Sequence, residues 1–212
     1  PQAGISYLIT ADPAGFGSTG DKSALTVWNT QSRTEAAFWE GRESPDKFAR
    51  RLLSAQERYN VALVAVESNA AACIATLKEM SVRNLLWTNR NHPGWYATNK
   101  RVQEAEALLV QMLHEREIHL RSRGMLHQLL NYDGSRKKRI KGFDGTTHHF
   151  DRARTAVMAA DILSKRYFVR AQPAQLKPHI PGQVTIGDLD RAKNAKIAAS
   201  RSPFNPISTH WS

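Results

Sequence analysis

The chain is poor in cysteine and in long apolar runs, and each shortage excludes a class of protein. Cys73 is its single cysteine, so we expect neither a disulfide framework nor a cysteine-based zinc site. No apolar run approaches the length that crosses a bilayer, and the start PQAGISYLIT lacks the basic head of a secretory signal. The sequence therefore predicts a protein without a membrane segment.

Acidic residues are also scarce relative to basic ones. The 19 Asp and Glu residues stand against 30 Lys and Arg, which leaves a formal net charge of +11. Such a balance favours a polyanionic partner, either nucleic acid or an anionic membrane surface. Because the chain carries no membrane signal, nucleic acid is the favoured partner.

The glycine-rich segment ADPAGFGSTGDKSAL, at residues 11–25, lacks the spacing of a phosphate-binding loop. In such a loop the lysine directly follows the second glycine, and a helix begins there. Here Asp21 separates Gly20 from Lys22, and the residues that follow, ALTVW, favour a strand. An ATPase is therefore disfavoured. We interpret the segment as a turn between two strands, the first of which ends at Asp12.

The order of apolar patterns predicts an α/β fold. The expected elements are strands at 5–12, 25–29 and 34–39, a helix from 44, a strand at 61–66, a helix at 70–80, a strand at 84–87, a helix at 99–115, a strand at 118–120, and helices at 125–130 and 149–167. This order matches the ribonuclease H-like architecture. In that architecture helices flank a mixed central sheet of three antiparallel strands followed by parallel ones, and the first and fourth strands lie side by side.

A change of composition predicts where the folded domain ends. Beyond residue 169 the chain becomes rich in Pro, Gly and polar residues. We expect residues 1–169 to form one ribonuclease H-like domain and residues 170–212 to form a basic, proline-containing C-terminal tail.

Three acids stand at the ends of predicted elements: Asp12 and Glu67 end strands, and Asp151 lies in the first turn of the last long helix. Carboxylates from three elements can hold two hard divalent ions that activate a water and stabilise a leaving oxygen. Ordinary alternatives exist, since Asp12 can cap a turn and Asp151 can favour a helix N-terminus. Glu67 follows six apolar residues, where a carboxylate is costly unless it is paired or coordinated. The ordered set favours a metal site.

Basic residues cluster just before the third acid, in the segment YDGSRKKRIKGFDG at residues 132–145, which predicts a basic hairpin or loop. The alternative is a solvated charged loop without a partner. The candidate phosphate contacts are Lys100, Arg136, Lys137, Lys138, Arg139 and Lys141. The candidates to support the metal ligands or orient a water are Asp21, Asn69, Asp144, His148 and His149.

At these residues the sequence resembles the nuclease domain of the large terminase subunit of tailed double-stranded DNA bacteriophages. None of the matching pieces is specific alone, but their ordered series is, and it spans roughly residues 5–166. The pieces are ADPAGFGSTGDKSAL (11–25), YNVALVAVESNAA (59–71), ATNK (97–100), REIHLRS (116–122) and HHFDRARTAVMAADIL (148–163).

The resemblance implies a ribonuclease H-like fold and a metal-dependent endonuclease that cuts concatemeric double-stranded DNA during genome packaging. It implies that Asp12, Glu67 and Asp151 bind Mg²⁺ or Mn²⁺, as two ions. The implied partners are double-stranded DNA, the portal protein, the small terminase subunit and a separate or excised ATPase domain, in the cytoplasm of the infected bacterial host. The tail is a candidate for docking to the portal or to another part of the motor.

One departure from the family pattern bears on the metal site. The family often has His-Asp-Asp where this chain has His149, Phe150 and Asp151, and Asp144 or His148 are candidates to replace the missing acid. Two alternatives to the terminase hypothesis remain at this point. One is another ribonuclease H-like nuclease, such as a junction resolvase. The other is a basic DNA-binding or assembly module without catalysis.

Overall fold

A computed structural model describes residues 1–14, 22–89, 92–132, 139–141 and 147–165. For residues 89, 139–141 and 147–149 only the backbone is described. The predicted tail at 170–212 thus lies outside the described residues. None of the described helices combines the length and the apolar character that a bilayer crossing requires.

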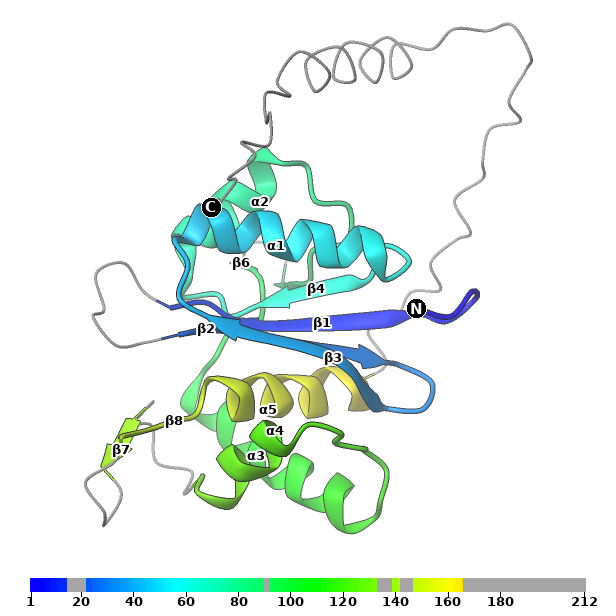
Figure 1. Cartoon of the computed structure of the whole chain (residues 1–212), viewed down its shortest axis with the longest axis vertical. Coiled ribbons are helices and arrows are strands. Elements are labelled where there is room, and N and C mark those ends of the chain that lie inside the picture. Colours follow the sequence, from blue (N-terminus) through cyan, green and yellow to red (C-terminus); the bar gives the residue numbers. More distant parts are fainter. Residues whose placement is uncertain (15–21, 90–91, 133–138, 142–146, 166–212) are drawn as a thin grey trace, which may run out of the picture. The chain divides into compact units, whose positions relative to one another are not determined.

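A four-stranded mixed sheet forms the centre of the fold (Figure 1), in the order β3-β2-β1-β4. Its strands are β1 (Tyr7–Asp12), β2 (Ser23–Asn29), β3 (Thr34–Gly41) and β4 (Leu63–Val66). The first three strands pair antiparallel, and β4 pairs parallel to β1. The predicted α/β class, the mixed sheet and the pairing of the first and fourth strands are confirmed.

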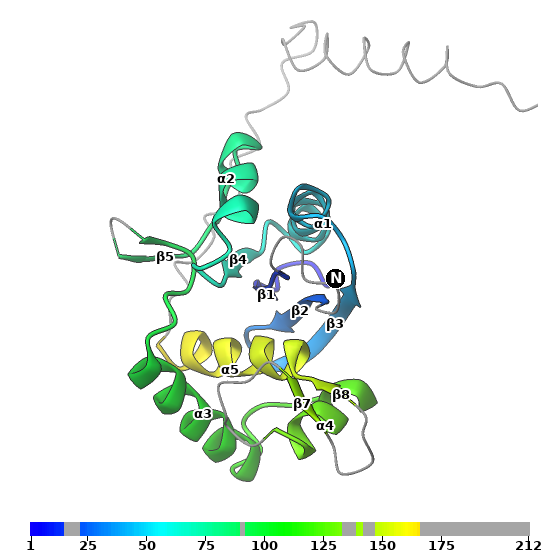
Figure 2. The ribbon, with the colours of Figure 1, turned by 90° about the vertical axis from the view of Figure 1, so that its left-hand side faces the viewer.

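Helices cover both faces of this sheet (Figure 2), with α1 and α2 on one face, α5 on the other, and α3 and α4 packed against α5. The helices are α1 (Pro45–Arg58), α2 (Ala71–Glu79), α3 (Asn99–His114), α4 (Arg123–Leu130) and α5 (Asp151–Ser164). Side chains of β1 alternate between two cores, because Ile9 packs with α1 and α2 whereas Leu8 packs with α5. Ala153, Ala156 and Ala160 are fully buried, so α5 lies close to the sheet.

The strand predicted at 84–87 is interrupted. Leu85 forms a single parallel bridge to Val64, and the chain then leaves as a hairpin of β5 (Trp87–Asn89) and β6 (His92–Pro93). It returns to β4 at Trp95, which bridges to Glu67. The return requires glycine at position 94, where φ is +87° and a Cβ would lie 2.4 Å from the Val66 carbonyl oxygen.

Two further predictions are corrected at the other side of the fold. The strand predicted at 118–120 is a single bridge between His119 and Thr34 of the edge strand β3. The last long helix begins at Asp151 rather than at His149, because His149 belongs to β8 (Thr147–His149). β8 pairs antiparallel with β7 (Arg139–Lys141), so the basic segment contributes one strand of a hairpin whose second strand follows it.

Candidate active site

Asp12 and Glu67 leave the sheet at the same end. Ala11 and Val66 are register partners, and the backbone N–H of Glu67 donates to the Ala11 carbonyl oxygen at 3.1 Å. Leu8 belongs to the core beneath α5, so side-chain alternation turns Asp12, four residues later, toward the same face. Glu67 follows Ala65 of that core by two residues and faces α5 as well. Both acids are buried, with 1% and 3% exposure.

Asp151 approaches this end of the sheet from α5, whose first residue it is, and it is 2% exposed. The position of the helix follows from two contacts. Thr155 Oγ1 lies 2.7 Å from Thr26 Oγ1 of β2, and Arg152 Nε lies 2.6 Å from Glu40 Oε2 of β3. Both strand residues belong to the half of the sheet in which Asp12 lies. The three acids, here called the acidic triad (Asp12, Glu67 and Asp151), therefore share one end and one face of the sheet.

The N-terminal end of α5 is fixed by side chains that were not among the predicted site residues. Phe150 supplies no side-chain cap; instead Gln128 Oε1 accepts hydrogen bonds from the backbone N–H groups of Arg152 and Ala153 at 2.9 and 3.1 Å. This satisfies donors that a helix start leaves open. Phe150 is buried and meets the Tyr132 ring edge-on at 5.5 Å. The residue that departs from the family pattern therefore packs in the core.

Arg154 contributes a positive charge to this site. It follows Asp151 by one helical turn, and its Nη2 lies 3.3 Å from Glu67 Oε1. Burial opposes the charge of Arg154, but Glu67, Tyr132 and Asp12 outweigh that effect and raise the pKa of the guanidinium above its ordinary value. Sequence reasoning missed Arg154, although its spacing from Asp151 places both on one face of a helix.

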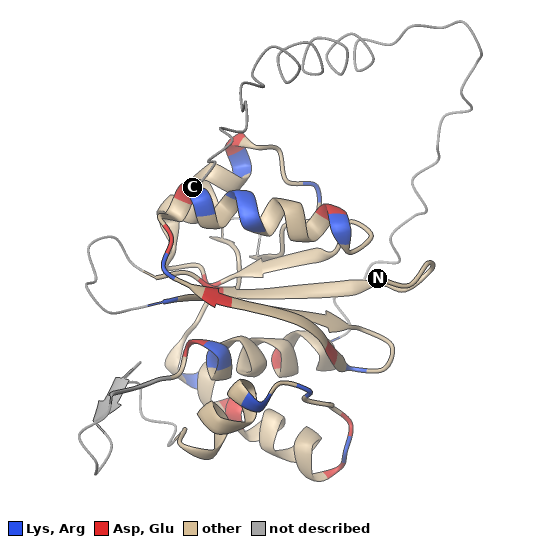
Figure 3. Ribbon diagram, in the orientation of Figure 1, with Lys and Arg blue, Asp and Glu red and all other residues tan. Residues whose placement is uncertain are grey.

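The donor chemistry of the acidic triad suits a hard divalent ion, because Mg²⁺ and Mn²⁺ prefer carboxylate oxygens. Figure 3 shows the strands uncharged along most of their length, with acidic residues at strand ends. Within the described part of the chain, however, no three His, Cys, Asp or Glu side chains are grouped so that they could hold a metal ion. The fold brings the triad to one region without assembling a finished metal centre there.

Comparisons with known proteins agree with this fold. The large terminase nuclease from thermophilic phage G20c is similar to the chain with a TM-score of 0.56 and 15% identity, over 79% of this chain and 85% of that one. Its magnesium-bound crystal structure gives a TM-score of 0.58 at 15% identity, over 76% and 83%. The chain has the fold of a phage terminase nuclease domain. The Thermus phage P74-26 nuclease domain shares this terminase nuclease fold, with a TM-score of 0.53 and 15% identity over 77% and 80%.

The G20c nuclease has also been crystallised with bound zinc and with bound cobalt. No protein-family model matches the chain, and no curated protein matches it. The likeness to the terminase nucleases thus rests on the arrangement of the backbone.

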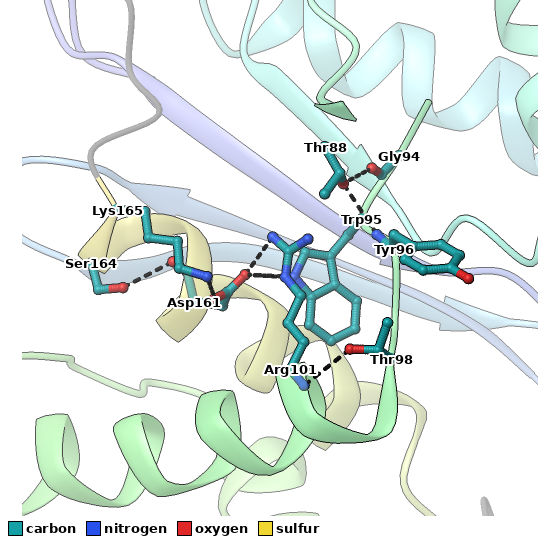
Figure 4. A network of polar contacts seen from close by, with 9 residues as sticks. All are labelled: Thr88, Gly94, Trp95, Tyr96, Thr98, Arg101, Asp161, Ser164 and Lys165. Carbon is teal, nitrogen blue, oxygen red and sulfur yellow. Dashed lines mark hydrogen bonds and ion pairs between the residues drawn. The ribbon is translucent and has the colours of Figure 1, made fainter. Parts of the chain in front are cut away.

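A further buried acid, Asp161, lies toward the C-terminal end of α5 (Figure 4). Its Oδ2 accepts hydrogen bonds from Trp95 Nε1 at 2.7 Å and from Arg101 Nε and Nη2 at 2.8 and 2.7 Å, and its Oδ1 pairs with Lys165 Nζ at 2.5 Å. Burial acts to raise the pKa of Asp161, but the hydrogen bonds from Lys165, Trp95 and Arg101 hold it below its ordinary value. Because Trp95 is bridged to Glu67, this network also fixes the backbone beside the triad.

Two of the predicted site residues outside the triad, Asn69 and Lys100, are exposed. Asn69 lies in the turn after β4, two residues beyond Glu67. Lys100 is 88% exposed, with its Nζ 3.9 Å from Glu104 Oε1, and it adjoins Arg101, the partner of Asp161. Ten residues of helix separate Asp161 from the start of α5, about 15 Å along the axis. Lys100 therefore lies toward the end of α5 that is remote from the triad.

The remaining predicted residues are not placed. Asp21, Arg136, Lys137, Lys138 and Asp144 lie outside the described residues. The backbones of Arg139, Lys141, His148 and His149 lie in β7 and β8, and their side chains are not described.

Proposed function

We propose that the chain is a divalent-metal-dependent endonuclease that cuts double-stranded DNA during phage genome packaging. The observation that carries the proposal is the placement of the acidic triad, whose three buried carboxylates share one end and one face of the sheet. The fold is shared with terminase nucleases that have been crystallised with magnesium, zinc and cobalt. The net charge of +11 supports DNA as the substrate.

In this proposal the acidic triad binds Mg²⁺ or Mn²⁺, as two ions. Ions held by these carboxylates would supply a lowered pKa for an attacking water and stabilisation of the charge on the leaving oxygen of the phosphodiester. Asp12 and Glu67 are held by adjacent strands, so their backbones keep a fixed spacing. Gln128 holds the first turn of α5, which positions Asp151. Burial keeps bulk water from competing for the carboxylates.

Arg154 has a role of its own in the proposal. In the structure its guanidinium compensates the charge of Glu67 inside a buried site. If Glu67 held a metal ion, this contact would weaken and Arg154 would be available to another anion. Its planar fork then suits the scissile phosphate, which it can hold by charge-assisted hydrogen bonds.

The wider setting belongs to the same proposal. The basic residues Arg136, Lys137, Lys138, Arg139 and Lys141 contact phosphates of the duplex beside the cut, with Lys100 as a more distant contact. The chain works with the portal protein, the small terminase subunit and an ATPase domain, in the cytoplasm of the infected bacterium. Residues 170–212 form the tail that docks to this motor.

Cleavage of supercoiled plasmid tests the proposal. The wild type is incubated with EDTA, Mg²⁺ or Mn²⁺ beside Glu67→Gln and the matched control Glu35→Gln, which changes a buried glutamate on β3, the edge strand farthest from β4. We expect cutting only with metal, its loss in Glu67→Gln and its retention in Glu35→Gln. Intact plasmid under every condition would favour a DNA-binding module without catalysis. A strong preference for a four-way junction over linear duplex would favour a resolvase.

A further inference from the structure

A groove lies between α2 and the β5–β6 hairpin, on the face of the sheet opposite the acidic triad. Its volume is about 320 Å³, and it is lined by Ser68, Ala71 and Lys78 on one side and by His92 and Tyr96 on the other. Ala71 has a small side chain, so little side-chain volume projects into the groove from that part of α2.

Aromatic rings at and beside this groove face the solvent. Tyr96 is 44% exposed and Trp87 is 47% exposed. The His92 ring is stacked on Tyr96 with centroids 5.0 Å apart, and Lys78 Nζ lies 5.1 Å from the centroid of the Trp87 ring. Exposed rings interleaved with a cation are typical of surfaces on which unpaired bases stack while the cation faces a phosphate.

The groove is fixed to the strand end that carries Glu67. The backbone N–H of Ser68 donates to the Trp95 carbonyl oxygen at 3.0 Å, so one wall begins directly after Glu67. The other wall is held by Thr88, whose hydroxyl oxygen accepts from the Tyr96 backbone N–H at 3.1 Å and donates to the Gly94 carbonyl oxygen (Figure 4). The Tyr96 ring is thus presented by a braced backbone rather than by a loose loop.

We propose that this groove binds unpaired nucleotides of a DNA strand, with bases stacked on Tyr96 and Trp87 and a phosphate near Lys78. Bases in an intact duplex hide their faces, so exposed rings select unpaired nucleotides. The net charge of +11 favours a nucleic acid over a protein as the occupant. The inference rests on the proposed function in one respect, because the DNA strand bound in the groove is taken to be one that the acidic triad cuts.

Fluorescence anisotropy in EDTA tests the groove without metal or cleavage. A labelled oligothymidine and a labelled blunt duplex are each titrated with the wild type, Tyr96→Ala, Trp87→Ala, Tyr96→Phe and the control Leu130→Ala, which changes a side chain that is 86% exposed on α4. We expect Tyr96→Ala and Trp87→Ala to weaken oligothymidine binding about tenfold. Tyr96→Phe retains the ring, and it and Leu130→Ala bind as the wild type does. Duplex affinity stays within about twofold throughout.

Two results would overturn the proposal. Unchanged oligothymidine affinity in both alanine variants would leave the groove to a protein partner, and an equal loss for oligothymidine and duplex would make it a general duplex contact. Melting temperatures of the variants, compared with the wild type, exclude loss of fold as the cause. The outcome is separate from that of the nuclease proposal, because selective loss of oligothymidine binding supports the groove even if no variant cuts DNA.

Discussion

The two ends of α5 hold buried acids in different ways. Toward its C-terminal end one carboxylate, Asp161, is surrounded by donors from Trp95, Arg101 and Lys165. At its N-terminal end the acidic triad lies at one end of the sheet, and Arg154 pairs with Glu67 and also feels the charge of Asp12. An acid surrounded by donors fixes neighbouring elements to one another, whereas two acids that share one cation concentrate negative charge that a metal ion can use.

The largest expected difference between the two ends is in catalysis. Asp12→Asn and Asp151→Asn should each lower the rate of metal-dependent plasmid cutting by at least about a thousandfold, because each removes one of the carboxylates proposed to hold the ions. Asp161→Asn should cut at a rate near that of the wild type at a temperature at which it is folded. Cutting lost in Asp161→Asn but kept in the other two would reverse the assignment of the two ends.

For the free energy of unfolding we expect the opposite order, with the larger effect at Asp161. Asp161→Asn leaves Arg101 and Lys165 beside a neutral group, so we expect the free energy of unfolding to fall by roughly 3 kcal/mol. Asp151→Asn should change it by less than about 1 kcal/mol, because loss of like-charge repulsion offsets lost contacts. Urea denaturation measures both, and equal losses would remove the distinction between the two ends.

The pH dependence of this stability follows from the pKa of Asp161. That pKa is lowered in the folded chain from an ordinary value of 3.8, so ionised Asp161 stabilises the fold fully above 3.8. The contribution is lost as the pH falls through the lowered folded value. Urea titrations should therefore show a constant gap between wild type and Asp161→Asn from neutral pH down to about pH 5, and a closing gap below the ordinary value. A gap that widens in acid would contradict the assigned sign.

A smaller effect is expected from the shared cation. Arg154→Gln removes the charge that competes for Glu67, so Mn²⁺ affinity measured by calorimetry should rise by about tenfold, a coupling of about 1.4 kcal/mol. The same variant should cut DNA more slowly, because it lacks the guanidinium that is proposed to hold the scissile phosphate. A fall in Mn²⁺ affinity would instead make Arg154 a support for the metal ligands.

The smallest effect is expected at Lys100, which is remote from the triad and 88% exposed. Lys100→Ala should weaken duplex binding by no more than about twofold, and chiefly at low salt, since it removes at most one phosphate contact. Anisotropy at two salt concentrations measures this loss. A large loss at high salt would place the DNA across both ends of α5.

The sheet and its helices could be predicted from the sequence because each depends on local pattern. The apolar run before Glu67 and the alanine-rich face of α5 have the periods of a buried strand and of a helix on a sheet. The prediction of a strand at 84–87 was wrong, because the pairing beside β4 is divided between Leu85 and Trp95, with a hairpin between them. When a hairpin separates two residues that pair with the same strand, the sequence shows no continuous alternation of apolar and polar residues from which a strand could be predicted.

At the site, the positions of Asp12, Glu67 and Asp151 at element ends could be predicted, but the groups that surround them could not. Gln128 caps α5 from a different helix, and Arg154 meets Glu67 across the interface between helix and sheet. Such contacts depend on how α4 and α5 pack, which no local spacing encodes. Only the position of Arg154 on the helix face shared with Asp151 offered a signal.

Calorimetric titration of Mn²⁺ into the wild type, Glu67→Gln and Glu35→Gln tests whether the acidic triad is the metal site. Both variants replace a buried glutamate by its amide, but only Glu67 belongs to the acidic triad. We expect Mn²⁺ to bind the wild type and Glu35→Gln, and binding to be lost in Glu67→Gln. Equal binding in all three proteins, or none in the wild type, would contradict the assignment of the triad as the metal site.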